Sequence, residues 1–171
     1  MRFAACCIVL ALTFVAFQSA NADDKMVYAA KATSKFANFP GLPTCMSGSV
    51  QNGDPSKGPS VILAKATAGC VIPWHWHTAN EQLMVVGGAA KVAMKDGPPT
   101  TIHSGDYLSL PAKNAHEFTC AAACSVFIVS DAAFDIHYVD KDGKEISPDE
   151  ALKSKAKAPM KKAAKEKETK M

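Results

Sequence analysis

Two histidines stand one residue apart in the middle of the chain, within residues 70–83 (CVIPWHWHTANEQL), and a glutamate follows four residues later. Successive side chains of a β-strand point to opposite faces, so His75 and His77 share a face and lie about 7 Å apart along it. The short connection at residues 78–80 is expected to bring Glu81 back beside them. Two imidazoles and a carboxylate that converge in this way predict a site for a divalent transition-metal ion.

A further ligand is expected at His116, which follows a predicted strand at residues 107–110 and a turn at Pro111. The alternative is that these histidines are ordinary surface or packing residues, the usual interpretation of a single histidine. Four donors in register favour the metal site. His103 and His137 fit no ligand position and are expected at the surface.

The elements that must position these residues are short β-type runs separated by turn signals such as Asn52-Gly53 and Asp142-Gly143. The expected strands are residues 49–51, 61–65, 71–77, 82–86, 89–94, 100–103, 107–110, 116–120, 125–130 and 135–139. Residues 148–153 are expected to begin a short helix. Many short strands at this spacing predict an all-β barrel or sandwich.

The two ends of the chain differ from the core. Residues 1–22 combine Arg2, an apolar run and a small-residue cleavage pattern, which predicts a secretory signal peptide rather than a membrane anchor. Residues 23–150 form the expected domain, and residues 151–171 form a Lys-rich tail expected to be disordered. The tail is interpreted as solubilising, or else as a basic arm for a membrane surface or polyanion. The protein is therefore expected in the periplasm or outside the cell, with no membrane span and no nucleic-acid partner.

Four cysteines follow the predicted signal peptide, and an even number in an exported protein predicts disulfides. Of three possible pairings, Cys120–Cys124 across a short hairpin and Cys45–Cys70 across a longer one are favoured. Thiolate ligation of the metal remains an alternative, because Cys120 shares strand parity with His116. Redox catalysis by Cys-x-x-x-Cys is less favoured, since the familiar motif has two intervening residues.

Around the expected ligands, the sequence resembles the cupin superfamily. The first cupin motif is matched by Gly69, His75, His77, Glu81 and Gly88, and the second by Gly105, Pro111 and His116. Lys113 replaces the second glycine of the second motif, which predicts a different turn there, and Thr119-Cys120 stand where its asparagine would fall. The resemblance spans residues 41–139.

The resemblance implies a single cupin-type jelly-roll barrel that holds one Fe, Mn, Ni or Zn ion. Its ligands would be His75, His77, Glu81 and His116, with one or two positions left open for water or substrate. It also implies a homodimer, since cupins commonly form dimers. Trp74 and Trp76 face away from the site and are expected to pack against another sheet or a partner subunit.

The expected pocket around the ion is apolar. By strand parity its lining would include Val71, Leu83, Val85 and Phe118. The sequence contains no arginine after Arg2, and arginine is the usual bidentate partner of carboxylates and phosphates. This counts against two cupin activities, oxalate-type decarboxylation and sugar-phosphate isomerisation, and favours a neutral, aromatic or enolic small molecule.

Three functions remain open. The first is a metal-dependent, dioxygenase-like enzyme in which Glu81 either stays a ligand or acts as a base. The second is a module that binds or senses a small ligand through the same ion without turnover. The third is a structural cupin whose metal only stabilises the barrel. The fold alone cannot separate them.

Overall fold

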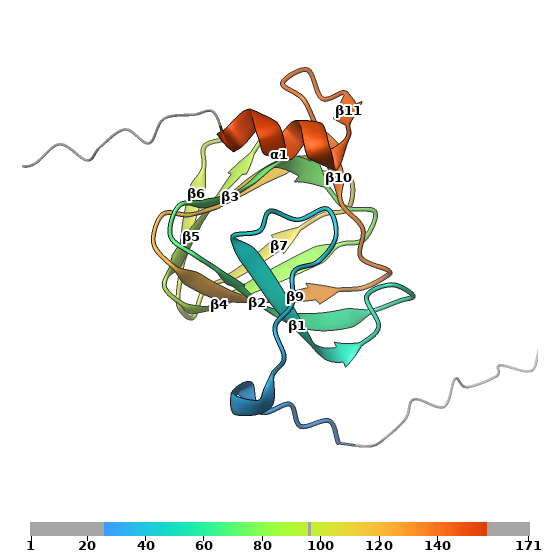
Figure 1. Ribbon diagram of the computed structural model, residues 1–171, viewed down its shortest axis with the longest axis vertical. Coiled ribbons are helices and arrows are strands. Elements are labelled where there is room, and N and C mark those ends of the chain that lie inside the picture. The colour runs from blue at the N-terminus through green and yellow to red at the C-terminus, as the bar shows by residue number, and fades with distance from the viewer. Residues whose placement is uncertain (1–25, 96, 157–171) are drawn as a thin grey trace, which may run out of the picture.

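A computed structural model describes residues 26–95 and 97–156 (Figure 1). The expected signal peptide at residues 1–22 and the last fifteen residues of the expected tail, 157–171, lie outside the described residues. No helix in the described part of the chain is long and apolar enough to cross a membrane.

The regular structure of the described chain is almost entirely antiparallel strand, which confirms the all-β class and its jelly-roll form. The elements are η1 (Lys31–Thr33), β1 (Met46–Gly53), β2 (Ser60–Ala66), β3 (Cys70–Trp76), β4 (Glu81–Gly87), β5 (Ala89–Met94), β6 (Thr100–His103), β7 (Tyr107–Leu110), β8 (His116–Cys120), β9 (Cys124–Ser130), β10 (His137–Val139), β11 (Glu145–Ile146) and α1 (Pro148–Ala156). One sheet has the order β1-β2-β9-β4-β7, and the other has the order β11-β10-β3-β8-β5-β6. Figure 1 shows the two sheets facing each other around a common interior.

The interior is formed by alternate residues of facing strands, as the pleat of a β-strand requires. In the first sheet Ile62, Ile128 and Leu83 are directly opposite one another on β2, β9 and β4, and all three are buried. Two residues further along these strands, at the end of the barrel where β4 begins, the same register aligns Ser60, Ser130 and Glu81, which are also buried. A polar row therefore borders the apolar core at this end.

A bulge interrupts the central strand β3. Ile72 is opposite Phe118 on β8, but the next aligned pair is His75 opposite His116, so β3 carries one extra residue between them. Pro73 lies in this interval, and proline in a central strand is found essentially at bulges. The extra residue shifts the side-chain alternation, so Ile72 shares the inner face with His75. The expectation that Val71 shares that face is wrong for this reason.

Two disulfides close the end of the barrel away from the histidines. They join Cys45 to Cys70 and Cys120 to Cys124, the pairing favoured from the sequence. Cys70 and Cys120 are themselves opposite each other on β3 and β8. Because Cys120 is bonded to Cys124, the structure leaves no thiolate at Cys120 to ligate a metal.

The helix α1 extends the folded domain beyond residue 150. Ala151 is only 1% exposed and belongs to the hydrophobic core, with Leu152 packed beside it. The domain boundary expected after residue 150 is therefore too early: the regular structure continues to Ala156. The sequence also missed the short strand β11 and the 3₁₀ turn η1.

Candidate metal centre

Three buried histidines converge at one end of the barrel. His75 ends the regular part of β3, His116 begins β8 directly opposite it, and His77 follows β3 by one residue. Their side chains are between 2% and 5% exposed. One ring nitrogen from each lies within 4.8 Å of the others, a spacing that could hold one metal ion.

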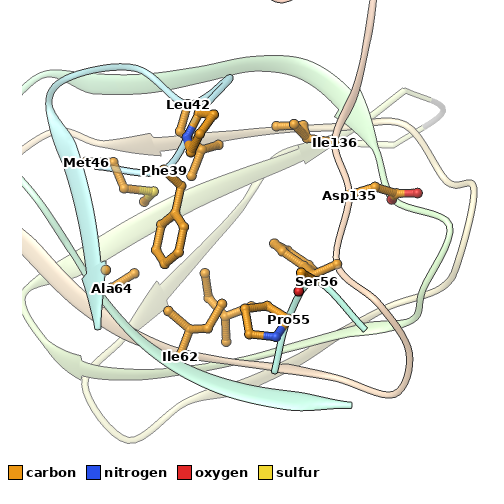
Figure 2. A pocket seen from close by; sticks show the side chains of 13 residues that line it. Phe39, Leu42, Met46, Pro55, Ser56, Ile62, Ala64, Asp135 and Ile136 are labelled. Atoms are coloured by element: carbon orange, nitrogen blue, oxygen red, sulfur yellow. The ribbon is translucent and has the colours of Figure 1, made fainter. Parts of the chain in front are cut away.

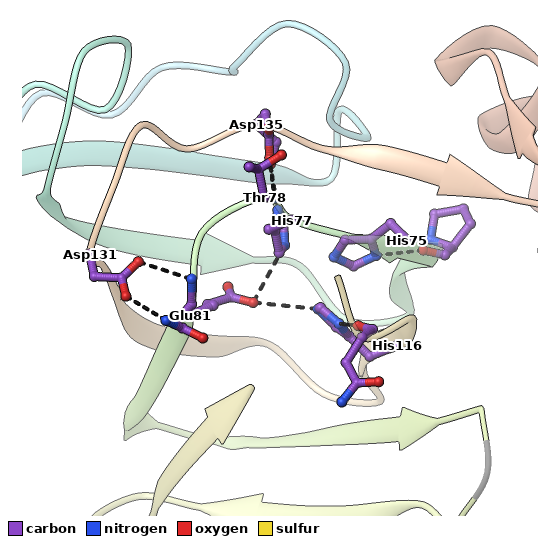
Figure 3. Close-up of polar contacts among 10 residues, drawn as sticks. His75, His77, Thr78, Glu81, His116, Asp131 and Asp135 are labelled. Carbon is purple, nitrogen blue, oxygen red and sulfur yellow. Dashed lines mark hydrogen bonds and ion pairs between the residues drawn. The ribbon is translucent and has the colours of Figure 1, made fainter. Parts of the chain in front are cut away.

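The other ring nitrogen of each histidine is fixed by a backbone carbonyl (Figure 3). Nδ1 of His75 donates to the Pro73 carbonyl at 2.7 Å, and Nδ1 of His116 donates to the Asn114 carbonyl at 3.0 Å. Nδ1 of His77 donates to the Asp135 carbonyl. Since a carbonyl only accepts, each Nδ1 carries the proton, and each Nε2 presents a lone pair to the centre.

Burial also favours the neutral, metal-binding form of these rings. Desolvation holds the pKa of His75 well below its ordinary value, and the neighbouring His116 and His77 lower it further. Desolvation likewise lowers the pKa of His77, although the charge of Glu81 opposes the shift. Both imidazoles are therefore neutral at pH 7, with Nε2 free to bind a cation.

Glu81 completes the cluster. Its carboxylate is buried, and Oε2 lies 3.4 Å from Nε2 of His77 and 3.4 Å from Nε2 of His116. Oε2 has no hydrogen-bond partner among the described residues. Three acceptors thus point at one another, an arrangement that a shared cation would stabilise.

The spacing of these donors fits a divalent ion. Two ligands that are each about 2.1 Å from a metal at a tetrahedral angle are about 3.4 Å apart. The nitrogen and carboxylate donors suit Fe, Mn, Ni or Zn. The structure therefore brings together all four residues that the sequence nominated as ligands.

Two aspartates from the loop between β9 and β10 hold the ligand-bearing segment in place. Asp131 accepts hydrogen bonds from the Asn80 backbone N–H at 3.0 Å and from its side-chain amide at 2.5 Å. Asp135 accepts the Thr78 N–H at 2.8 Å, besides its carbonyl contact with His77. Both aspartates are more than 50 residues away in the sequence from Thr78 and Asn80, which they bind. No motif or spacing in the sequence indicated them.

Lys113 adopts the conformation that a glycine would be expected to provide. Its φ is +60°, the one positive value among the described non-glycine residues. Its backbone N–H donates to the His77 carbonyl at 2.8 Å. Lys113 therefore takes the left-handed conformation at the position of the motif's glycine and holds the turn against His77.

Outside the centre, Trp76 and His137 form a stacked pair. Their ring centroids are 3.9 Å apart with planes 5° from parallel. His137 also contacts Glu145 at 2.8 Å and Asp135 at 3.1 Å, and although burial lowers its pKa, these carboxylates outweigh burial and raise it. Trp76 is thus covered by the adjacent strand rather than by another sheet. His103 is exposed, and its Nδ1 lies 3.7 Å from Oδ2 of Asp106.

The expected pocket residues lie in the core. Leu83, Val85 and Phe118 are at most 4% exposed and pack within the main hydrophobic cluster. Val71 is on the other side of β3. A cavity of about 330 Å³ does lie beside the centre, but none of these four residues lines it (Figure 2).

Comparison with known proteins bears on the family and the fold. The family model described as "Cupin domain" matches residues 63–130. Among solved structures, the polyketide cyclase RemF from Streptomyces resistomycificus is similar at a TM-score of 0.59 and 15% identity, over 68% of this chain and 87% of that one. An RmlC-like cupin from Shewanella frigidimarina is similar at a TM-score of 0.53 and 14% identity, over 64% and 92%.

KdgF from a Halomonas species is similar at a TM-score of 0.54 and 16% identity, over 64% of this chain and 94% of that one. At these identities the likeness shows a shared fold. No curated protein sequence matches the chain.

Proposed function

We propose that the chain, whose residues 63–130 match the cupin-domain model, is an exported metal-dependent cupin enzyme acting on a small neutral or enolic organic molecule, with dioxygenase-like chemistry. The observation that carries the proposal is the facing of Glu81 Oε2 and two histidine Nε2 atoms at 3.4 Å inside a buried site. A cluster of acceptors without a donor is costly unless a cation lies among them.

The chemistry divides between the ion and the chain. A divalent ion bound by these residues supplies Lewis acidity or redox chemistry at positions the protein leaves open. His75, His77 and His116 hold it through neutral Nε2 atoms. Among the described residues, Glu81 presents its carboxylate oxygen to two of these histidines, so it is the group placed to accept a proton from an enol or hydroxyl.

The substrate class follows from charge. Arg2 is the chain's one arginine, so the described fold has no guanidinium fork for a carboxylate or phosphate. Leu83 and Phe118, two residues beyond Glu81 and His116 on their strands, are buried in the hydrophobic core. A substrate that brings one weakly acidic oxygen and an uncharged body suits this setting better than an acid or a sugar phosphate.

Export is supported by the cysteines. Two disulfides, Cys45–Cys70 and Cys120–Cys124, are typical of proteins that fold outside the reducing cytoplasm. Cell fractionation of the producing host with antibody detection tests this part of the proposal. Recovery of the full-length protein only in the cytoplasm, with reduced cysteines, would contradict it.

The metal proposal is tested by elemental analysis with plasma mass spectrometry. The wild-type protein is expected to contain about one transition-metal ion per chain, and the His75→Ala/His77→Ala variant should lose it. His103→Ala serves as the control, because His103 is exposed and remote from the centre. Absence of metal from wild-type protein purified without chelators from its own host would overturn the proposal.

The metal found directs the next assay. Iron, manganese or nickel would favour redox chemistry, and oxygen uptake should then depend on an added enol or catechol. Zinc would favour Lewis-acid chemistry or the rival function, a module that binds a small ligand through the ion without turnover. Stoichiometric binding of such compounds with no product over hours would select that rival.

A further inference from the structure

The three candidate metal-binding histidines differ in how their rings are fixed. His75 and His116 each donate their Nδ1–H to a carbonyl two residues earlier in the chain, at 2.7 Å and 3.0 Å. His77 donates instead to the carbonyl of Asp135, 58 residues further along. The local backbone sets the first two contacts, whereas the third exists only while another part of the fold holds Asp135 beside the ligand. The orientation of His77 therefore depends on a distant segment.

Asp135 is anchored through both oxygens of its carboxylate. Oδ1 accepts the backbone N–H of Thr78 at 2.8 Å, and Oδ2 lies 3.1 Å from Nε2 of His137. Thr78 follows His77 directly, so the first bond joins Asp135 to the ligand-bearing segment itself (Figure 3). The second bond joins it to β10, which is paired with β3 in the second sheet. The His137 contact thus connects the carbonyl partner of His77 to the body of the barrel.

His137 is itself held by further contacts. Its Nδ1 lies 2.8 Å from Oε1 of Glu145 on β11. Its ring stacks on that of Trp76, with centroids 3.9 Å apart and planes 5° from parallel. Trp76 is directly opposite His137 in the pairing of β3 with β10, and it immediately precedes His77 in the chain. The imidazole that contacts Asp135 thus has a fixed position and a fixed plane beside the ligand-bearing strand.

His137 contacts two carboxylates at once. An ionised carboxylate accepts hydrogen bonds and does not donate them, so both ring nitrogens of His137 carry protons when both bonds form, which is the imidazolium form. Burial lowers the pKa of His137, but the hydrogen bonds with Glu145 and Asp135 outweigh burial and raise the pKa. Hydrogen bonds between charged partners are roughly twice as strong as neutral ones. The contact that anchors Asp135 is therefore a charge-assisted one.

We propose that His137 is a positioning residue for the metal centre. By holding the Asp135 carboxylate, it places the Asp135 carbonyl on Nδ1 of His77, which fixes the proton there and directs Nε2 toward the ion. His75 and His116 have local carbonyl partners, so His77 is the ligand whose geometry depends on β10 and β11. The inference rests on the proposed function only for the ion, because the orientation of His77 belongs to the metal-free protein as well.

The first test follows the histidine tautomers by NMR. His137→Phe keeps a ring that can stack on Trp76 and removes both N–H groups. Long-range ¹H–¹⁵N spectra of the EDTA-treated protein distinguish the Nδ1–H and Nε2–H forms of each imidazole. The wild type is expected to show the Nδ1–H form at all three candidate ligands. In His137→Phe, His77 should become a mixture of both forms, while His75 and His116 stay unchanged and serve as internal controls.

The second test measures metal affinity by competition between the protein and a chelator for Zn²⁺. Residues that support a metal ligand contribute about 10–100-fold to affinity, and His137 acts through Asp135, so His137→Phe should weaken Zn²⁺ binding about tenfold. His103→Phe is the matched control, because His103 also lies beside an aspartate, with Nδ1 3.7 Å from Oδ2 of Asp106. It is paired with the end of β5 opposite to the end that faces His116. This control should stay within about twofold of the wild type.

The proposal is overturned if His77 keeps a single Nδ1–H form in His137→Phe, or if all three candidate ligands change together. It is also overturned if the wild type binds Zn²⁺ and the affinity of the variant stays within about twofold. If His137→Phe does not fold, Asp135→Ala decides, because it keeps the carbonyl and removes the carboxylate. It should produce the same change at His77 and the same loss of affinity, and failure of either would overturn the proposal.

The two tests also separate this inference from the proposed function. A wild type that binds no Zn²⁺ or other transition metal, with the selective change at His77 in the variant, would sustain the inference while the proposed function fails. Metal binding with His77 unchanged in the variant would do the reverse.

Discussion

Replacing Glu81 by glutamine is expected to stabilise the metal-free protein and to weaken metal binding. In the wild type, Oε2 faces Nε2 of His77 and of His116 at 3.4 Å, and the carboxylate has no donor to offer them when ionised. The glutamine amide carries two N–H donors in the same place. Two new hydrogen bonds at about 0.5–1.5 kcal/mol each would raise the free energy of unfolding by about 1–3 kcal/mol.

The effect on metal binding has the opposite sign. Even partners that only support a ligand contribute 10–100-fold to metal affinity, so loss of a charged ligand is expected to cost at least about 100-fold. Urea unfolding of EDTA-treated protein measures the first effect, and chelator competition measures the second. Glu150→Gln, an exposed change on α1, should stay within about 0.5 kcal/mol in both states.

Two results for Glu81→Gln would contradict this prediction. A Glu81→Gln protein that is less stable without metal would show that the carboxylate is a satisfied structural group in the wild type. Unchanged metal affinity would show that Glu81 is not a ligand. Either result would leave the three histidines as the candidate site and remove the carboxylate from it.

Three further predictions concern stability. Below pH 6.5, His75 alone should lower the free energy of unfolding of the metal-free protein by up to about 1.4 kcal/mol per pH unit. Burial lowers the pKa of His75 in the folded state, so the unfolded chain takes up the proton first. Urea unfolding midpoints of the wild type and His75→Gln, compared across pH, measure this effect. Cys45→Ala/Cys70→Ala opens a loop spanning 25 residues and should lower the free energy of unfolding by about 3.5 kcal/mol in denaturant titrations, and no change would contradict the closed loop. At the left-handed Lys113, glycine should stabilise by up to about 1 kcal/mol and valine destabilise by about 1 kcal/mol or more, and equal effects would exclude backbone strain.

The sequence predicted that His75, His77 and Glu81 lie together because local periodicity places them. His75 and His77 share a face through the two-residue repeat of a strand, and Glu81 follows through a short connection. The bulge in β3 breaks the same periodicity two residues earlier, so the face of Val71 was predicted wrongly. Pro73 was the available signal, since a central strand tolerates proline at a bulge and rarely elsewhere.

What the sequence could not predict depends on contacts between distant segments. Asp135 lies 58 residues from His77, whose tautomer its carbonyl sets. The cavity is likewise closed by residues 39–42 and 134–136 over strands that lie between them in the chain. No periodic pattern relates such segments, so a parity argument placed the pocket among core residues such as Leu83, which do not line the cavity.

The loop between β9 and β10 ties the two halves of the site together. Its Phe134 forms a wall of the cavity and packs on His77, while the next residue, Asp135, sets the tautomer of the same histidine and holds Thr78. A change that reshapes the cavity through this loop therefore also disturbs a metal ligand. Ile62 and Ala64 on β2 also line the cavity but have no such contact with the histidines. Substitutions at these two positions are therefore expected to reshape the cavity with little effect on the metal centre, whereas substitutions at Phe134 should affect both.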